Sequence, residues 1–189
     1  VLGAADKFRL FELLPGFEKR SETAVFHCEV EEARSFVSSR SLEERTRAFI
    51  KLQDGCDYKC TFCTIPQARG ASRSAAPQQA LADCRDALAA GAKELVLTGV
   101  NLGDYGANPT PETHGWDFLR LIQLLDAELT DCPRIRISSI EPNLLSDEII
   151  RFVAGSQRFM PHFHIPLQSG SDEVLGQMRR RYRRQLYAD

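Results

Sequence analysis

Three cysteines lie close together in the stretch GCDYKCTFCTIPQARG, residues 55 to 70. Cys56, Cys60 and Cys63 have the spacing C-x3-C-x2-C, and thiolates at such short spacing are usual ligands of zinc and of iron–sulfur clusters. A closed zinc or cluster site takes four protein ligands, whereas three ligands leave one coordination position open. The spacing therefore predicts a reactive metal centre.

None of the other cysteines is a good candidate for a fourth ligand. Cys84 shares a predicted helix face with leucines three and four residues away, a pattern typical of a buried core residue. Cys28 falls in TAVFHCEV, residues 23–30, an alternating segment that is a candidate short strand, and Cys132 precedes a proline in a predicted loop. One alternative stays open, a structural zinc site completed by a distant histidine such as His114.

The composition excludes several classes of protein. The chain has 189 residues, of which 43% are hydrophobic, enough for one globular domain with a sizeable core or one domain plus part of another. It has no apolar run long enough to cross a bilayer and no signal sequence at its start. We therefore expect a cytoplasmic protein with reduced cysteines and no membrane partner. The net charge of −2 creates no domain-wide positive field, so any contact with RNA must be local.

Strands and helices alternate from residue 48 onward, which predicts an α/β fold with parallel strands and helices packed on the sheet. Pro77 in the first turn and Gly91 at the end mark the first of these helices. The predicted strands are 48–53, 94–100, 134–140 and 162–167, and the helices that follow them are 76–94, 116–129, 146–155 and 171–181.

The loops after these strands carry most of the unusual polar residues. Ligands of parallel α/β sheets gather at the carboxyl ends of the strands, so we expect Cys56, Asn101, Glu141 and Gln168 to meet at one rim. The sheet is expected to be open or curled into a partial barrel, and since four βα units are too few to close an eight-stranded barrel, we expect an exposed edge strand. The start at Val1 and the arginine-rich end also suggest a fragment.

The cysteine loop and its flanking residues resemble those of a known family. RAFIKLQDGCDYKCTFCTIPQARG is similar to the signature of the radical S-adenosylmethionine (SAM) enzymes, and in particular of the methylthiotransferases. The resemblance continues through LTGVNLGDYG, RIRISSIEP, HFHIPLQSGSDEVLGQMRRRY and, at the front, VLGAADKF. It implies a radical SAM (β/α) barrel of which about four of the six βα units are present. Residues 1–44 then correspond to the tail of an N-terminal methylthiotransferase domain and a linker, and residues 45–189 to the radical SAM core domain, truncated at its C-terminus.

The resemblance also assigns roles to residues of the cysteine loop. It implies that Cys56, Cys60 and Cys63 hold a 4Fe-4S cluster whose open iron binds the amino and carboxylate groups of SAM, and that Phe62 lies beside the adenine. An electron passed through the cluster cleaves SAM to methionine and a 5′-deoxyadenosyl radical, while the protein supplies placement and water exclusion. In the methylthiotransferases the activated carbon then receives sulfur, and a second SAM donates the methyl group.

The other predicted cofactor-binding residues come from the later loops. By resemblance, Thr98 and Gly99 approach the methionine end of SAM, although a strand-end glycine is an equally ordinary reading. Glu141 is expected to hold the ribose hydroxyls, or to be a solvated loop carboxylate. Gln168 and Ser169 are expected to line the same cavity, with helix capping by Ser169 or Ser171 as the alternative. No residue is assigned a catalytic role beyond cofactor binding.

The expected substrate is N6-threonylcarbamoyladenosine at position 37 of tRNA, with isopentenyladenosine tRNA or a ribosomal-protein aspartate as alternatives within the family. A zinc-stabilised binding module without catalysis is the alternative from another class. The run Arg179–Arg184, with Tyr182 available for stacking, could contact RNA phosphates of the anticodon loop, or could be a solvated helix end. The family also implies a second 4Fe-4S cluster in a missing N-terminal domain, an RNA-binding C-terminal domain, and an electron donor such as flavodoxin.

Overall fold

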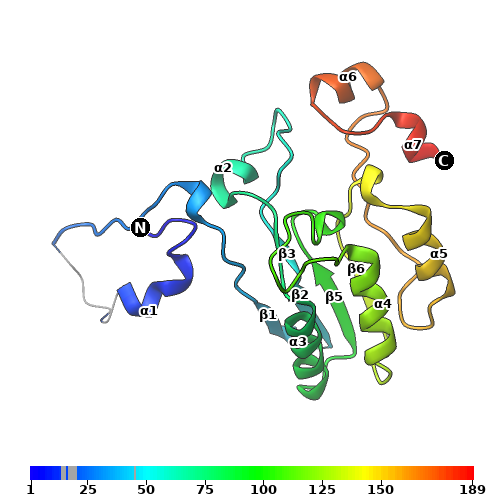
Figure 1. Ribbon diagram of the computed structural model, residues 1–189, viewed down its shortest axis with the longest axis horizontal. Helices are drawn as coiled ribbons and strands as arrows, with labels where there is room; N and C mark the ends of the chain where they lie inside the picture. The colour runs from blue at the N-terminus through cyan, green and yellow to red at the C-terminus, as the bar shows by residue number, and fades with distance from the viewer. Residues whose placement is uncertain (14–15, 17–20, 45) are drawn as a thin grey trace.

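The computed structural model describes residues 1–13, 16, 21–44 and 46–189, and its centre is a four-stranded sheet in the order β1-β2-β5-β6 (Figure 1). Three strands run parallel, namely β2 (Arg47–Lys51), β5 (Glu94–Thr98) and β6 (Ile135–Ile137). β1 (Arg40–Glu44) joins the edge of the sheet antiparallel to β2. The parallel strands confirm the predicted α/β fold class.

Three helices connect or follow the parallel strands and pack against the sheet, α3 (Pro77–Ala89), α4 (Phe118–Glu128) and α5 (Asp147–Gly155) (Figure 1). The core lies between them and the sheet, where Ile50 of β2 and Leu97 of β5 have no exposed surface. Each side chain of this size contributes roughly 1.5–3 kcal/mol when it is fully removed from water. Burial of one sheet face therefore holds the strands in place and leaves their carboxyl ends free to carry a site.

The ends of these helices follow the local sequence signals. Pro77 occupies the first helical position of α3, and Gly91 has a φ of 99° just beyond its last turn. Asp117 and Ser146 cap α4 and α5, because each side chain accepts a hydrogen bond from a backbone N–H in the first turn. The predicted starts of these helices and the predicted ends of α4 and α5 are confirmed to within two residues, whereas α3 ends at Ala89, five residues before the predicted bound of 94 and just before Gly91.

Two predicted strands do not form regular strands. Segment 162–167 is joined to the sheet only through isolated parallel pairing of His164 with Ser139, where the backbone N–H of Ile140 donates to the carbonyl of His164 at 3.1 Å. Pro166 has no N–H to extend that pairing. Segment 23–30 has only one bridge, from Phe26 to Leu2. The fourth strand and the strand at 23–30 were therefore wrong as regular elements.

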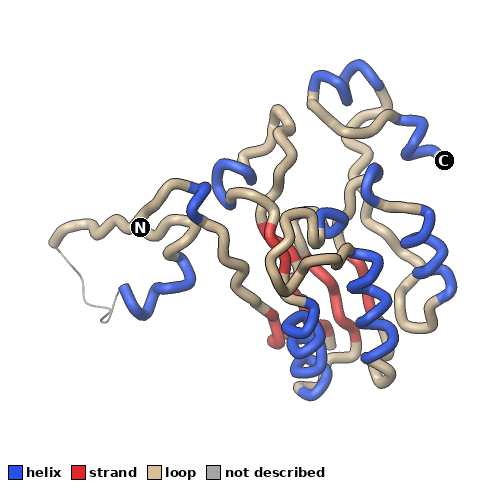
Figure 2. Tube along the Cα trace, viewed as in Figure 1, coloured by secondary structure: helices blue, strands red, loops and turns tan. Residues whose placement is uncertain are grey.

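The N-terminal part of the chain lies beside the carboxyl end of β2. The Lys51 ammonium is 5.0 Å from the ring centre of Phe8 and 4.9 Å from that of Phe36, and burial lowers its pKa. No helix among the described residues has both the length and the apolar character needed to cross a membrane. The remaining elements are short (Figure 2): η1 (Lys7–Arg9), α1 (Leu10–Leu13), η2 (Val30–Glu32), β3 (Gln53–Asp54), α2 (Ile65–Arg69), β4 (Arg73–Ser74), η3 (Leu102–Asp104), η4 (Pro142–Leu144), α6 (Asp172–Gln177) and α7 (Arg184–Ala188).

Candidate functional site

The cysteine loop follows β2 and β3 at the carboxyl edge of the sheet. Cys60 is buried, Cys56 and Cys63 are half-buried, and the backbone N–H of Cys63 donates to the carbonyl of Cys60 at 3.1 Å. Burial raises the pKa of the Cys56 thiol to about 11, and the neighbouring Asp104, Cys60 and Cys63 add to the shift. With that pKa the Cys56 thiol is protonated at neutral pH, so binding to a metal centre would have to release its proton.

A buried carboxylate anchors the start of this loop. Asp54 accepts hydrogen bonds from the backbone N–H of Gly55 at 2.9 Å and from the guanidinium groups of Arg69 and Arg73, both at 3.0 Å. Arg69 lies at the end of α2 and Arg73 on β4, so Asp54 of β3 joins the two ends of the cysteine loop. The amide of Gln53 also donates to the carbonyl of Gly55 at 2.8 Å.

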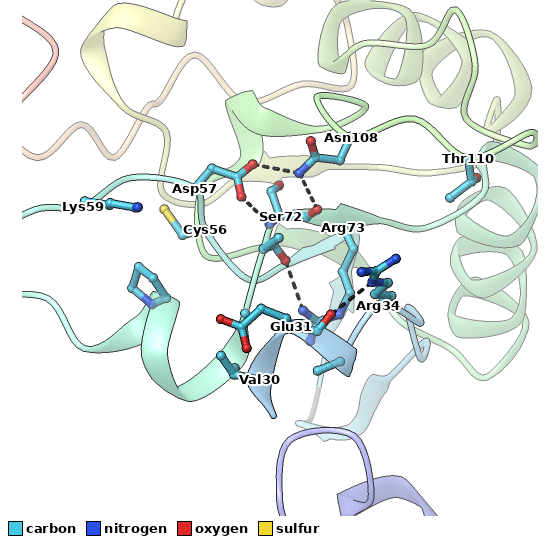
Figure 3. A pocket seen from close by; sticks show the side chains of 14 residues that line it. Val30, Glu31, Arg34, Cys56, Asp57, Lys59, Ser72, Arg73, Asn108 and Thr110 are labelled. Carbon is cyan, nitrogen blue, oxygen red and sulfur yellow. Dashed lines mark hydrogen bonds between the residues drawn. The ribbon is translucent and has the colours of Figure 1, made fainter. Parts of the chain in front are cut away.

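A second polar group fixes the loop from the side (Figure 3). Asp57 accepts hydrogen bonds from the backbone N–H of Ser72 at 3.1 Å and from the side-chain amide of Asn108 at 2.7 Å. Asn108 belongs to the long loop after η3, so it joins the cysteine loop to the loop of the next βα unit. These residues and Cys56 line a cavity of about 690 Å³, whose opposite wall includes Val30 and neighbouring residues of the N-terminal segment.

Gly55 is required by the turn into the cysteine loop. Its φ is 72°, and a Cβ added there would lie 2.0 Å from the carbonyl oxygen of Ala71. We predict that Gly55→Ala lowers the free energy of unfolding by at least about 2 kcal/mol, because the strained backbone and the overlap must both be relieved. Urea unfolding measures this loss. Gly155→Ala is the control, since a Cβ at that helical position meets no atom and the change should be neutral or stabilising.

Glu141 lies just beyond β6 on the same rim, as predicted. Its backbone N–H donates to the side-chain oxygen of Asn101 at 3.4 Å, and the amide of Asn101 donates to Asp104 at 2.9 Å. Burial raises the pKa of the Asp104 carboxyl, although the hydrogen bond from Asn101 opposes the shift. The loops after β5 and β6 are thus joined next to the cysteine loop.

Arg180 connects the cysteine loop with Glu141, and the sequence did not identify it as a site residue. Its side chain is only 4% exposed, and one guanidinium nitrogen donates to Sγ of Cys60 at 3.2 Å. Another nitrogen donates to the Glu141 carboxylate. The backbone N–H of Thr61 also donates to the carbonyl of Met178 at 3.3 Å. The segment after α6 therefore packs against the cysteine loop.

The arginine run has a different structure from the predicted helix end. α6 ends at Gln177, and Arg179 has a φ of 57°, so the helix does not continue through the arginines. Tyr182 is buried, and its hydroxyl donates to the carbonyls of Pro166 at 2.6 Å and Leu167 at 2.9 Å. Its ring is therefore not available to stack on a base. The exposed members of the run are Arg179, Arg181, Arg183 and Arg184.

Thr98 and Gly99 lie at the carboxyl end of β5, as predicted. The Thr98 hydroxyl donates to the carbonyl of Ile50 at 3.0 Å, and a Cβ added at Gly99 would lie 3.0 Å from the side chain of Gln53. Both residues line a cavity of about 610 Å³, together with Lys51 and other residues at the end of β2. A small residue at position 99 allows the side chains of Gln53 and Leu102 to pack closely against the backbone there.

Of the remaining predicted residues, Phe62 lies near Arg180, whereas Gln168 and Ser169 make no hydrogen bond to the site residues named above in the described part of the chain. The Phe62 ring is 54% exposed, and its centre is 6.0 Å from the Arg180 guanidinium. Gln168 is exposed with a φ of 62°, and the Ser169 hydroxyl accepts a hydrogen bond from the backbone N–H of Ser171 at 3.1 Å. Ser171 caps α6, which confirms the capping alternative for that serine.

The donor set of three thiols suits an iron–sulfur cluster. Zinc requires its ligands to converge on one point, and among the described residues no three His, Cys, Asp or Glu side chains do so. The thiolates on a four-iron cube bind different iron atoms, so they need not converge. Cys84 and Cys132 are buried in the core, and His114 is exposed, so none of these completes the set.

Curated relatives carry methylthiotransferase names. The threonylcarbamoyladenosine tRNA methylthiotransferase MtaB of Bacillus subtilis (strain 168) is 36% identical over 191 residues, covering 100% of this chain and 42% of that protein. MtaB of Rickettsia prowazekii (strain Madrid E) is 41% identical, covering 76% of this chain and 34% of its own length. The tRNA-2-methylthio-N(6)-dimethylallyladenosine synthase of Paracoccus denitrificans is 39% identical, covering 71% and 30%. The chain thus spans less than half the length of these relatives.

A solved structure shares the fold of this chain, and a family model matches most of its length. The radical S-adenosylmethionine methyltransferase TsrM from Kitasatospora setae, solved with cobalamin and a 4Fe-4S cluster bound, matches with a TM-score of 0.55 over 74% of this chain and 25% of TsrM. The sequence identity is 15%, so this likeness concerns the fold alone. The model of the radical SAM superfamily matches residues 50–189. The chain therefore belongs to the radical SAM superfamily.

Proposed function

We propose that this chain is the radical SAM core of a tRNA methylthiotransferase that acts at C2 of N6-threonylcarbamoyladenosine 37. The observation that carries the proposal is a three-thiol loop at the carboxyl edge of a parallel sheet, in a chain 36% identical along its full length to a protein of that name. The open coordination position suits a site that must bind a reactant as well as a cluster.

In this proposal the cysteine loop and the neighbouring loops hold two cofactors. Cys56, Cys60 and Cys63 hold a 4Fe-4S cluster, and SAM binds beside them. Together these cofactors supply the one-electron chemistry that removes a hydrogen atom from an unreactive carbon. The residues proposed to contact SAM are Phe62, Thr98, Gly99, Glu141, Gln168 and Ser169.

The remaining residues of the site position these groups. Asp54 and Asp57 hold the two sides of the cysteine loop through the contacts described above. The exposed arginines Arg179, Arg181 and Arg183 carry positive charge on the segment that packs against the loop, which suits contact with the phosphates of an anticodon loop. Sulfur insertion, a second cluster and docking of an electron donor such as flavodoxin are proposed to involve regions present in the longer relatives.

The test is mass spectrometry of tRNA nucleosides from cells that lack the parent gene. Loss of the methylthio form of threonylcarbamoyladenosine, restored by the intact gene and not by one with Cys63→Ala, is the expected result. Loss of the methylthio form of isopentenyladenosine instead would assign the chain to the other tRNA branch, which the 39% identity to the Paracoccus synthase keeps in view. An unchanged nucleoside profile would contradict tRNA modification and favour the ribosomal-protein alternative.

A further inference from the structure

Arg180 is the arginine of the run that donates a hydrogen bond to a cysteine of the loop, and its contacts are unusual for a surface-type residue. Its guanidinium donates to Cys60 Sγ at 3.2 Å and to the Glu141 carboxylate, and its centre lies 5.3 Å from the ring centre of Tyr182. These partners lie 120 and 39 residues away along the chain. A side chain that is 96% buried therefore joins a predicted cluster ligand to a predicted cofactor-binding residue.

The hydrogen bonds of Arg180 to described residues use two of its three guanidinium nitrogens. Its Nε is buried without a hydrogen-bond partner among the described residues. The contact with Cys60 places a permanent positive charge and an N–H donor on a sulfur that would bind iron. Glu141, whose side chain is 15% exposed, neutralises much of that charge at the other end. Removal of either partner would leave the other as an unpaired charge in a poorly solvated place.

We propose that Arg180 is a positioning residue that sets the reduction potential of the cluster through its hydrogen bond to Cys60, with Glu141 holding the guanidinium in place. Hydrogen bonds to cluster sulfurs and nearby positive charge stabilise the reduced, more negative state and so raise the potential. The negative charge of Glu141 has the opposite effect and lowers the potential. This inference rests on the proposed function, because it requires a cluster on the cysteine loop.

The test is the midpoint potential of the anaerobically reconstituted chain, measured without SAM and without tRNA. Arg180→Gln should shift the potential to a more negative value, because it removes the positive charge beside Cys60 and leaves Glu141 unpaired. Arg180→Lys, which keeps the charge, should fall between that variant and the wild type. Glu141→Gln should shift the potential in the positive direction. Arg181→Gln is the charge-matched control, because Arg181 lies 3.9 Å over the Tyr58 ring and makes no hydrogen bond to a thiol, and its shift should be smaller.

The outcomes separate this inference from the proposed function. A wild-type chain that assembles no cluster would overturn both. A wild-type cluster whose potential is the same in Arg180→Gln, or is shifted equally by Arg181→Gln, would overturn the role of Arg180 alone. If Arg180→Gln does not assemble a cluster, Arg180→Lys and Glu141→Gln decide, and equal potentials in these two variants would overturn the inference. Opposite shifts on removing the two partners are not expected from general loss of structure.

Discussion

Replacing Cys63 with alanine is expected to reduce the iron bound after anaerobic reconstitution from about four atoms per chain to less than about one. The cluster would keep only two protein thiolates, and two ligands leave half of the cube exposed to solvent and exchange. Iron and sulfide assays, together with the brown visible absorbance of the cluster, measure the loss. Reductive cleavage of SAM should be lost with it.

Cys28→Ala is the matched control for the Cys63 variant. Cys28 is also half-buried and also carries a free thiol, but it lies in the N-terminal segment outside the cysteine loop. Its removal should leave the iron content unchanged. Full iron content in Cys63→Ala would show that Cys63 is not a ligand. A colourless wild-type chain that binds one zinc ion would instead support the zinc-stabilised binding module.

The helices of the core could be predicted because each has strong local signals. In α4, apolar residues recur at helical spacing, and a capping aspartate stands immediately before the helix. β5 is buried along most of its length and has an uninterrupted apolar run. Such elements are specified by their own sequence, because the same residues both favour the local conformation and supply the buried face.

Edge elements were harder to predict because their neighbours decide them. The segment 162–167 alternates like a strand, but the pairing stops at a single bridge near His164. β1 was taken for linker because its sequence, RSLEE, is mostly charged and lacks apolar alternation. Charged residues are common on edge strands, where they prevent further pairing. Backbone hydrogen bonds to β2 hold β1 in place, and hydrophobic periodicity does not reveal such bonds.

In the site, too, residues with a local sequence signal could be predicted, and residues placed by long-range contacts could not. The cysteine spacing is local, so it identified the loop directly. The rim position of Glu141 followed from the order of strands. From the sequence, Arg180 was interpreted only as one residue of a charged run. Its hydrogen bond to Cys60 joins residues 120 positions apart, and no local pattern reveals such a contact. Asp54 had a local signal that was not used, a carboxylate placed immediately before a glycine that enters the cysteine loop.

Asp54→Asn is the second change for which a large effect is expected, a loss of about 3–5 kcal/mol from the free energy of unfolding. The Asp54 carboxylate faces Arg73, whose side chain is only 8% exposed, at 3.0 Å. An amide cannot compensate that buried charge, and it cannot accept all three hydrogen bonds that Asp54 now accepts. Urea unfolding at neutral pH measures the loss. The cysteine loop should also load iron more slowly, since Asp54 ties both of its ends.

The pH dependence of the free energy of unfolding distinguishes two effects of Asp54→Asn, the loss of the negative charge and the change in side-chain shape. Burial opposes ionisation of Asp54, but the hydrogen bond from Arg69 and the charge of Arg73 outweigh it, so the pKa of Asp54 lies below its usual value. Its stabilisation is complete above the unfolded-state pKa of about 4 and is lost as the pH falls through the lower folded-state value. The wild type should lose stability over that range more steeply than Asp54→Asn. Asp147→Asn is the control, because its ion pair with Arg151 is exposed and should contribute less than about 1 kcal/mol. Equal acid sensitivity of wild type and Asp54→Asn would mean that the carboxylate charge does not hold the loop.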